Sequence, residues 1–298
     1  MLLLTGATGL VGSAVLGRLL AEGAEVRCLV RDPRRLGARR VRVQIALGDL
    51  TDPPSFRNAL RGVHTVVHLA ASIRDQPRGS IEELNGIATW RMVEAAERQG
   101  VERFVFFSAL GASTHHRTRC LRAKALAEQA VREADVRSIV FAPSIVYAPG
   151  DPWLTLLERL ALLPVMPVSG SGRAAFQPIW ADDVAACVLA ALRGDGEGPR
   201  DEALHSRYEL AGPETLSHSE IVRTLLRSLS RRRPLLHVPT PIVSRALRAL
   251  ERVGGSRAFA TWDEAELMET AMTSPRGAAD AEALGVRPQR MAAVLGGT

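Results

Sequence analysis

The strongest constraint on the fold of this chain is a glycine-rich turn that joins a short apolar run to a helix-patterned segment. Residues 5–12 read TGATGLVG and follow directly on the apolar run 2–5. Apolar residues then recur at helical spacing over 10–21. A glycine pattern in this context, with a strand before it and a helix after it, predicts a loop that binds the pyrophosphate of a dinucleotide.

Each glycine of the turn has a separate expected role. Gly6 allows the tight turn, Gly9 lets the pyrophosphate approach the backbone, and Gly12 lets the helix pack closely on the strand. We expect the amides at the helix N-terminus to face the phosphates. Thr8, Leu10 and Val11 therefore also belong to the expected cofactor-binding residues. The alternative is a glycine-rich turn that binds no ligand.

Short apolar runs and amphipathic segments alternate over the first half of the chain. The runs cover 26–30, 41–46, 63–70, 104–107 and 139–142, and helical patterns cover 54–60, 81–99 and 119–133. This alternation predicts an α/β fold, a Rossmann-type doubly wound parallel sheet with a smaller C-terminal α/β lobe. We expect a dinucleotide-binding domain over 1–145, completed by a crossover segment at about 175–212. The smaller lobe would comprise 146–174 and 213–298.

The end of the second apolar run bears on which dinucleotide binds. An NAD site places a carboxylate here, on the ribose hydroxyls, whereas an arginine can pair with the 2′-phosphate of NADP. The sequence gives Arg31 followed by Asp32, with Arg34 and Arg35 close by. If Arg31 occupies the position at the strand end, NADP is favoured, and a shift of one residue would place Asp32 there and favour NAD.

Composition excludes several classes of protein. The net charge is +6, but aromatic residues make up only 4%, and no recognition element accompanies the basic residues, so no nucleic-acid partner is expected. Three unpaired cysteines argue against a disulfide framework and a zinc site, and fit a reducing compartment. No signal peptide is visible and Glu158 and Arg159 interrupt the longest apolar stretch, so a cytoplasmic location is expected.

Of the 38 basic residues only Lys124 is a lysine, which suggests a position where arginine will not serve.

These motifs resemble those of the short-chain dehydrogenases/reductases, in their extended or atypical branch. The likeness is closest to the subgroup of the nucleotide-binding accessory subunit of respiratory complex I, and it is firm over about residues 1–190. Besides the glycine turn, the matching segments are Gly48-Asp49-Leu50, Leu69-Ala70-Ala71, Phe107-Ser108-Ala109, the segment from Pro143 through Ile145 to Tyr147, and the segments 176–179 and 182–185. The resemblance implies that Asp49 and Leu50 contact adenine, that Ala70 and Ala71 lie beside the ribose, and that Pro143 and Ile145 line the cofactor. It also implies a catalytic role for Ser108.

The catalytic motif of that family is incomplete here. The family uses a tyrosine and a lysine four residues apart on one helix, where the lysine holds the ribose and lowers the pKa of the tyrosine. Lys124 matches the lysine, but Cys120 stands at the tyrosine position, and Ala142 replaces an arginine. Cys120 either acts as a thiolate beside Lys124 or is a small residue left where the tyrosine was lost. His115 and His116 are further candidates for proton transfer.

Two functions remain open from the sequence. One is an NADP(H)-dependent oxidoreductase with an unusual mechanism, acting on an unidentified small carbonyl or hydroxyl compound, with Ser108, Cys120 and Lys124 as its catalytic residues. The other is a structural or regulatory protein that binds the cofactor without turnover.

A basic amphipathic pattern near the C-terminus suggests an additional surface. Residues 241–253 begin with a proline, carry an apolar stripe at helical spacing and present Arg245, Arg248 and Arg252 beside it. One interpretation is an ordinary helix packed on the core. The other is a contact with a membrane, at its inner face, or with a protein complex.

Overall fold

A single parallel sheet organises the first two thirds of the chain in the computed structural model, which describes residues 1–194, 204–245, 247 and 262–297. The seven strands lie in the order β11-β6-β5-β4-β1-β2-β3, and all neighbours are parallel. They are β1 (Leu2–Thr5), β2 (Val26–Val30), β3 (Gln44–Leu47), β4 (Thr65–His68), β5 (Arg103–Phe107), β6 (Arg137–Pro143) and β11 (His205–Leu210). The strand order reverses between β1 and β4, and ligands of doubly wound sheets bind in the crevice at such a point.

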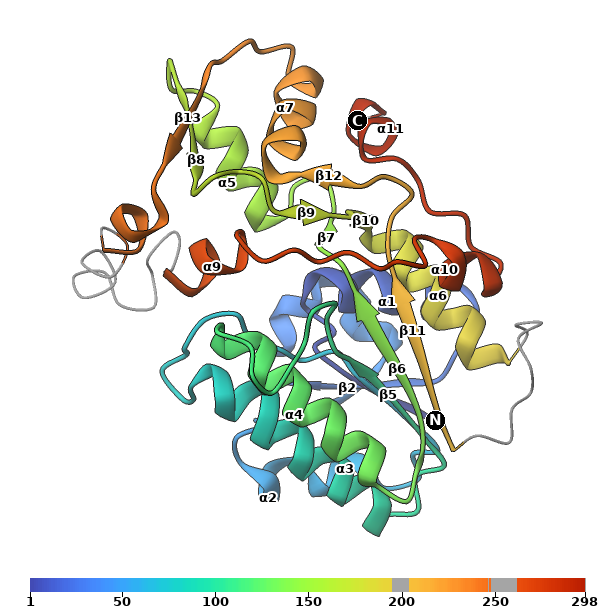
Figure 1. Cartoon of the computed structure of the whole chain (residues 1–298). Coiled ribbons are helices and arrows are strands. Elements are labelled where there is room, and N and C mark those ends of the chain that lie inside the picture. The colour runs from blue at the N-terminus through green and yellow to red at the C-terminus, as the bar shows by residue number, and fades with distance from the viewer. Residues whose placement is uncertain (195–203, 246, 248–261, 298) are drawn as a thin grey trace.

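Helices cover both faces of this sheet (Figure 1). On one face, α1 (Leu10–Ala21) packs against α6 (Ala181–Arg193) over Leu4, Cys28 and Val67. On the other face lie α2 (Pro53–Phe56), α3 (Ala88–Arg98) and α4 (Arg119–Glu133), over a second core that includes Leu3, Val66 and Phe104. Strands that are apolar on both sides require this double cover, so the Rossmann-type fold expected from the sequence is confirmed.

A smaller lobe continues from the carboxyl edge of the sheet, beyond the arrowheads of β6 and β11 in Figure 1. It contains three strand pairs, namely β7 (Val146–Tyr147) with β10 (Ile179–Trp180), β8 (Met166–Ser169) with β13 (Leu235–Val238), and β9 (Ala175–Phe176) with β12 (Leu216–Ser217). Its helices are α5 (Pro152–Leu160), α7 (His218–Ser228), α9 (Trp262–Leu267) and α11 (Met291–Gly296). A third core, with Tyr147, Phe176 and Leu225 at its centre, holds the lobe together.

The C-terminal tail returns to the large sheet. Helix α10 (Ala279–Ala283) packs beside β11, and the Asp280 carboxylate accepts a hydrogen bond from the backbone N–H of Glu209 at 2.7 Å. Ala281 and Leu284 join the core that contains β1 and α1. We therefore propose that the division between domain and lobe leaves this part of the tail with the dinucleotide-binding domain.

Several elements differ from the sequence expectation at their ends. The third strand begins at Gln44 rather than at 41, because 3₁₀ turns occupy Pro33–Arg42 and Gly37 adopts a positive φ of 58° within them. The segment expected over 54–60 divides into α2 and a 3₁₀ turn at Arg57–Leu60. The long helix expected over 81–99 begins with a π-helical turn at Glu83–Ile87.

The described residues contain no helix that is both long and apolar enough to cross a bilayer. Of the basic amphipathic segment 241–253, only 241–245 and 247 belong to the described residues, so its expected helix and surface role lie largely outside them.

Candidate functional site

The glycine turn brings α1 directly onto the end of β1. Gly6 has a φ of 72°, and a Cβ atom there would lie 2.5 Å from the backbone nitrogen of Ala70. A Cβ on Gly12 would lie 2.1 Å from the carbonyl oxygen of Gly6. No side chain larger than hydrogen fits at either position, because these contacts are with rigid backbone.

The N-terminus of α1 is free to receive an anion. Gly9 is the N-cap and is exposed, it provides no side-chain cap, and no acidic residue lies in the first turn. The amides of Leu10, Val11 and Gly12 have no earlier carbonyl within the helix to bond. A Cβ on Gly9 would meet only the Gly6 carbonyl, at 3.3 Å, so the space above it is open. This loop, with half-buried Thr8 beside it, therefore fits the pyrophosphate of a dinucleotide.

A carboxylate follows β3 at the adenine end of the expected cofactor path. Asp49 Oδ1 accepts bonds from the backbone N–H and the hydroxyl of Thr51, at 3.1 and 2.9 Å. Its buried Oδ2 has no hydrogen-bond partner in the described chain, although an Arg78 guanidinium nitrogen lies 3.6 Å away. Burial alone would raise the pKa of Asp49, but the Thr51 bonds and the charges of Arg31 and Arg78 lower it overall. An ionised oxygen with a free lone pair fits the exocyclic amino group of adenine.

Arg31 follows the last residue of β2, where the sequence placed it. Its side chain is exposed and its charge reaches Asp49, whereas the Asp32 carboxylate accepts a hydrogen bond from the backbone N–H of Arg34 at 3.0 Å. Asp32 thus caps the following turn, and Arg31 is exposed at the end of β2 with its charge felt by Asp49.

A buried polar chain supports the loop after β4. His68, at 1% exposure, bonds the hydroxyl of Thr5 at 3.0 Å through Nδ1 and that of Thr89 at 3.2 Å through Nε2. The Thr5 hydroxyl accepts the backbone N–H of Ala70 at 3.3 Å. Ala70 therefore lies against the glycine turn, beside the expected ribose, and exposed Ala71 follows it. His68 was not singled out from the sequence, although the family motif that Leu69-Ala70-Ala71 resembles begins with a histidine.

The expected catalytic residues lie at and after the end of β5. Ser108 is buried, and its hydroxyl has no hydrogen-bond partner within the described residues. Lys124 on α4 donates a hydrogen bond at 2.5 Å to the carbonyl oxygen of Phe107, the residue before Ser108. Burial lowers the pKa of Lys124 to about 8, and the Cys120 thiol one turn earlier opposes this shift.

Cys120 has the properties of a neutral thiol. Burial raises its pKa, and this effect outweighs the charge of Lys124, while Asp263 raises the pKa further. Lys124 thus favours the thiolate, as the sequence suggested, but by less than burial disfavours it. His116 is engaged locally, since its Nδ1 accepts the backbone N–H of Thr118 at 3.0 Å.

Pro143 and Ile145 form part of a turn that contacts the C-terminal strap, as we call the segment from α9 to α10 (residues 262–283). The Pro143 carbonyl accepts the backbone N–H of Leu110 at 2.9 Å, and the Ile145 carbonyl accepts that of Ile179 at 3.0 Å. Between them, the Ser144 hydroxyl donates to the Met272 carbonyl at 2.6 Å. The tail thus fixes the loop that leaves β6.

An arginine at the start of α4 ties the site to the C-terminal strap. Arg119 binds Asp75 at 2.9 and 3.0 Å and Glu82 at 2.7 and 2.8 Å, and a nitrogen of its guanidinium lies 3.6 Å from Asp263 of α9. We call this group the Arg119 clasp. It joins the loop after β4, the start of α4 and helix α9, which lies above the sheet's carboxyl edge in Figure 1. Its members are distant in sequence and no motif marks them.

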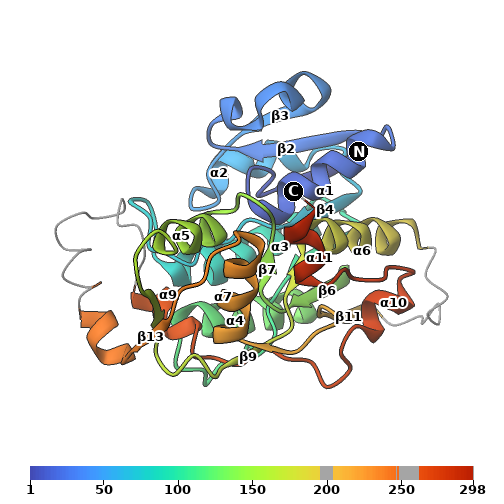
Figure 2. The same cartoon turned by 90° about the horizontal axis from the view of Figure 1, so that it is seen from above.

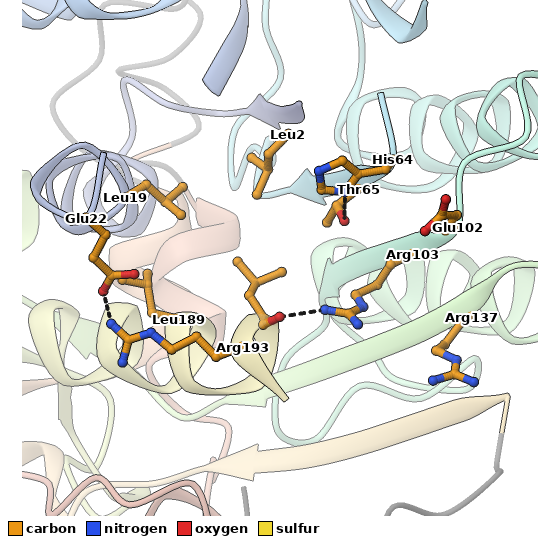
Figure 3. A pocket seen from close by; sticks show the side chains of 11 residues that line it. Leu2, Leu19, Glu22, His64, Thr65, Glu102, Arg103, Arg137, Leu189 and Arg193 are labelled. Carbon is orange, nitrogen blue, oxygen red and sulfur yellow. Dashed lines mark hydrogen bonds and ion pairs between the residues drawn. The ribbon is translucent and has the colours of Figure 1, made fainter. Parts of the chain in front are cut away.

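The site residues therefore meet at one edge of the sheet. Gly6, Arg31, Ala70, Ser108 and Pro143 each lie at or just after the carboxyl end of a strand, as the topological rule requires. A separate hollow of about 540 Å³ lies at the opposite, amino edge (Figure 3). Its lining includes Leu2, Thr65, Arg103 and Arg137, which are the first residues of β1, β4, β5 and β6. This hollow is remote from the expected cofactor path.

The fold, the glycine turn before α1 and the carboxylate after β3 together are typical of a protein that binds a nicotinamide dinucleotide. A family model described as NAD(P)H-binding matches residues 6–158. The chain belongs to this NAD(P)H-binding family. Its fold is similar to that of solved epimerase/dehydratase-like proteins of the short-chain dehydrogenase/reductase type.

Comparisons with individual proteins agree. The chain is 28% identical over 249 residues to the mitochondrial NADH dehydrogenase [ubiquinone] 1 alpha subcomplex subunit 9 of Arabidopsis thaliana, over 80% of this chain and 60% of that protein. It is 30% identical over 232 residues to a (4-alkanoyl-5-oxo-2,5-dihydrofuran-3-yl)methyl phosphate reductase of Streptomyces griseus, over 78% and 74% of the two chains. An NADPH-dependent quinone oxidoreductase of Escherichia coli, solved with NADPH, has a similar fold, with a TM-score of 0.77 at 16% identity over 99% and 98%. The chain spans only about 60% of the length of the first curated relatives it matches.

Proposed function

We propose that this chain is an NADP(H)-dependent oxidoreductase for a small carbonyl or hydroxyl compound, in which Ser108 binds the reacting oxygen. The observation that carries the proposal is the Ser108 hydroxyl, which is buried at the carboxyl end of β5 without a hydrogen-bond partner among the described residues. A buried hydroxyl left unbonded costs free energy, so a ligand oxygen at this position is its natural partner.

The preference for NADP rests on charge at the end of β2. Arg31 is exposed there and can form a charge-assisted bond with the 2′-phosphate, while Asp32 is committed to capping the next turn. The bound nicotinamide would supply or accept the hydride.

Proton transfer must take a route other than the family's tyrosine. With a pKa of about 8, the Lys124 ammonium is acidic enough to give up a proton near neutral pH. We propose that Lys124 stands beside the cofactor ribose and supplies the proton that the substrate oxygen gains on reduction. Cys120 contributes space rather than charge, because its thiol stays protonated.

A second candidate, cofactor binding without turnover, is favoured by one contact. The Lys124 ammonium donates to the Phe107 carbonyl, and Cys120 carries no charge, so neither group is directed to a substrate in this structure. The similarity to a subunit of NADH dehydrogenase [ubiquinone] also supports this candidate, because a subunit of a larger complex can serve a structural role without turnover of its own.

Cofactor oxidation separates the two candidates. Purified protein with NADPH would be assayed against a panel of aldehydes, ketones and quinones. Turnover that falls about 10- to 100-fold in Ser108→Ala, but not in the matched variant Ser228→Ala on α7, would support the oxidoreductase. If the protein binds NADPH but neither wild type nor Cys120→Tyr turns over any compound, the non-catalytic function holds instead.

A further inference from the structure

An exposed apolar and basic surface lies on the small lobe, away from the expected cofactor path. Large hydrophobic side chains that are exposed there belong to the turn after α5, to the β8/β13 pair and to the residues after it, namely Leu162 (63%), Leu163 (47%), Val165 (36%), Leu236 (55%) and Ile242 (56%). We call this set the lobe surface. Figures 1 and 2 both place the β8/β13 pair at the periphery of the molecule.

The pairing of β8 with β13 explains why these side chains share one face. Met166 pairs with Leu235 and Pro167 with Leu236. Met166 is fully buried in the lobe core, and Leu235 packs against that core. Because successive side chains of a strand alternate between faces, Val165, Pro167 and Leu236 point to the outer one.

Arginines border the same surface. Arg231 Nη1 donates to the carbonyl of Ala161 at 3.1 Å, and Arg233 Nε donates to the same carbonyl at 3.4 Å. These bonds fix the run 231–233 beside the exposed leucines 162 and 163. Arg159, in the last turn of α5, is also exposed.

Charge is strongly segregated along the sequence in this region. The segments 159–181 and 221–250 contain nine arginines and no acidic residue, whereas the whole chain has a net charge of only +6. The rest of the chain is therefore net acidic. A surface that combines exposed leucines with an excess of arginines matches the interface of an anionic bilayer, which accepts both apolar side chains and positive charge.

We propose that the lobe surface docks the protein peripherally on anionic phospholipid membranes. Leu162, Leu163 and Leu236 enter the interfacial region, and Arg159 and Arg232 lie at the headgroups. This surface adjoins the segment 241–253 expected from the sequence and shares Ile242 with it, but it is centred on the turn after α5 and on the β8/β13 pair. It depends on neither the cofactor nor turnover.

Sedimentation with vesicles tests the proposal on the full chain. We expect wild type to pellet with phosphatidylcholine vesicles that contain phosphatidylglycerol, to stay in solution with pure phosphatidylcholine, and to be released by high salt. Arg159→Glu/Arg232→Glu should lower the partition coefficient at least about 30-fold, and Leu162→Ser/Leu163→Ser at least about tenfold. Neither pair makes a side-chain hydrogen bond or ion pair that the structure describes, so folding should be retained, as circular dichroism would verify.

Two controls make the result specific. Arg40→Glu/Val41→Ser alters the same kinds of exposed residue near the edge strand β3 and should bind vesicles like wild type. Arg245→Glu/Arg248→Glu examines the basic part of the adjoining segment 241–253. Wild type that stays in solution with anionic vesicles at low salt would overturn the proposal, as would binding lost in the Arg245/Arg248 variant and unchanged in both lobe-surface variants.

Discussion

At the scale of single residues, the site depends on groups whose charge is set by burial. His68 is enclosed beneath the glycine turn, and burial, followed by the charge of Lys124, lowers its pKa to about 3. The ring is therefore neutral at ordinary pH and can bond Thr5 and Thr89 together. Burial also lowers the pKa of Lys124, but only to about 8, so that its ammonium group can give up a proton near neutral pH.

The neutral His68 predicts a pH dependence of stability. In the unfolded chain the histidine binds a proton below about pH 6.5, while the folded chain does not until about pH 3, so stability falls as the pH drops through this window. From pH 6.5 to 5 the loss from this residue is about 2 kcal/mol. The free energy of unfolding would be measured with urea at pH 7 and at pH 5. Its decrease between the two pH values should be smaller by about this amount in His68→Asn than in wild type. Equal losses in the two proteins would show that His68 is not held neutral.

At the scale of elements, helix α1 contains two glycines with opposite requirements. Gly12 sits against the Gly6 carbonyl, whereas a Cβ on Gly17 would meet only the flexible end of Arg39, at 3.5 Å. Gly12→Ala should lower the free energy of unfolding by about 3 kcal/mol or more and abolish cofactor binding. Gly17→Ala, its control in the same helix, should be neutral or stabilise by up to about 1 kcal/mol. Similar effects of the two changes in thermal unfolding would refute the close packing at Gly12.

The Arg119 clasp makes a prediction for the loop after β4 and for α9. Bonds from Arg119 hold the pKa of Glu82 at about 2, so the clasp stays charged through the physiological range. Arg119→Gln removes the cation that bonds Asp75 and Glu82 and lies near Asp263, while the Arg74–Glu264 ion pair between the same two segments stays in place. Amide exchange over 72–82 and 262–267 should become faster, while Arg98→Gln, which breaks an exposed pair on α3, should leave it unchanged. Unchanged exchange in Arg119→Gln would mean that the clasp does not hold these segments.

Local sequence predicted those elements whose cause is local. The strand 26–30 and the helix 119–133 agree with β2 and α4 to the residue, because an apolar run and a helical period mark them directly. The π-helical turn was not foreseen, since Asn85 at its centre bonds the backbone of Ser72 and Ile81. The clasp was missed for the same reason, as Asp75, Arg119 and Asp263 meet only in the folded chain.

At the scale of the whole molecule, the two ends of the expected cofactor path differ. The phosphate and adenine end follows the family pattern, with Gly6, Gly12 and Asp49 in place, while the catalytic end has Cys120 for a tyrosine. The tail that crosses from the lobe back to β11 is bonded to the loop after β6 through Met272 and to β11 through Asp280, so it lies on the side of the catalytic end. The proposed function places binding before chemistry, and so binding is what must be measured first.

Isothermal titration calorimetry with NADPH and with NADH tests most directly the central claim that the chain binds NADP(H) through Arg31. Wild type should bind NADPH more tightly than NADH, and Arg31→Ala should weaken NADPH by about 10- to 100-fold while NADH changes little, because one charge-assisted bond to the 2′-phosphate is lost. Arg40→Ala, from the same basic cluster, should change neither affinity. Absence of binding to either cofactor, or an equal loss for both in Arg31→Ala, would contradict the account.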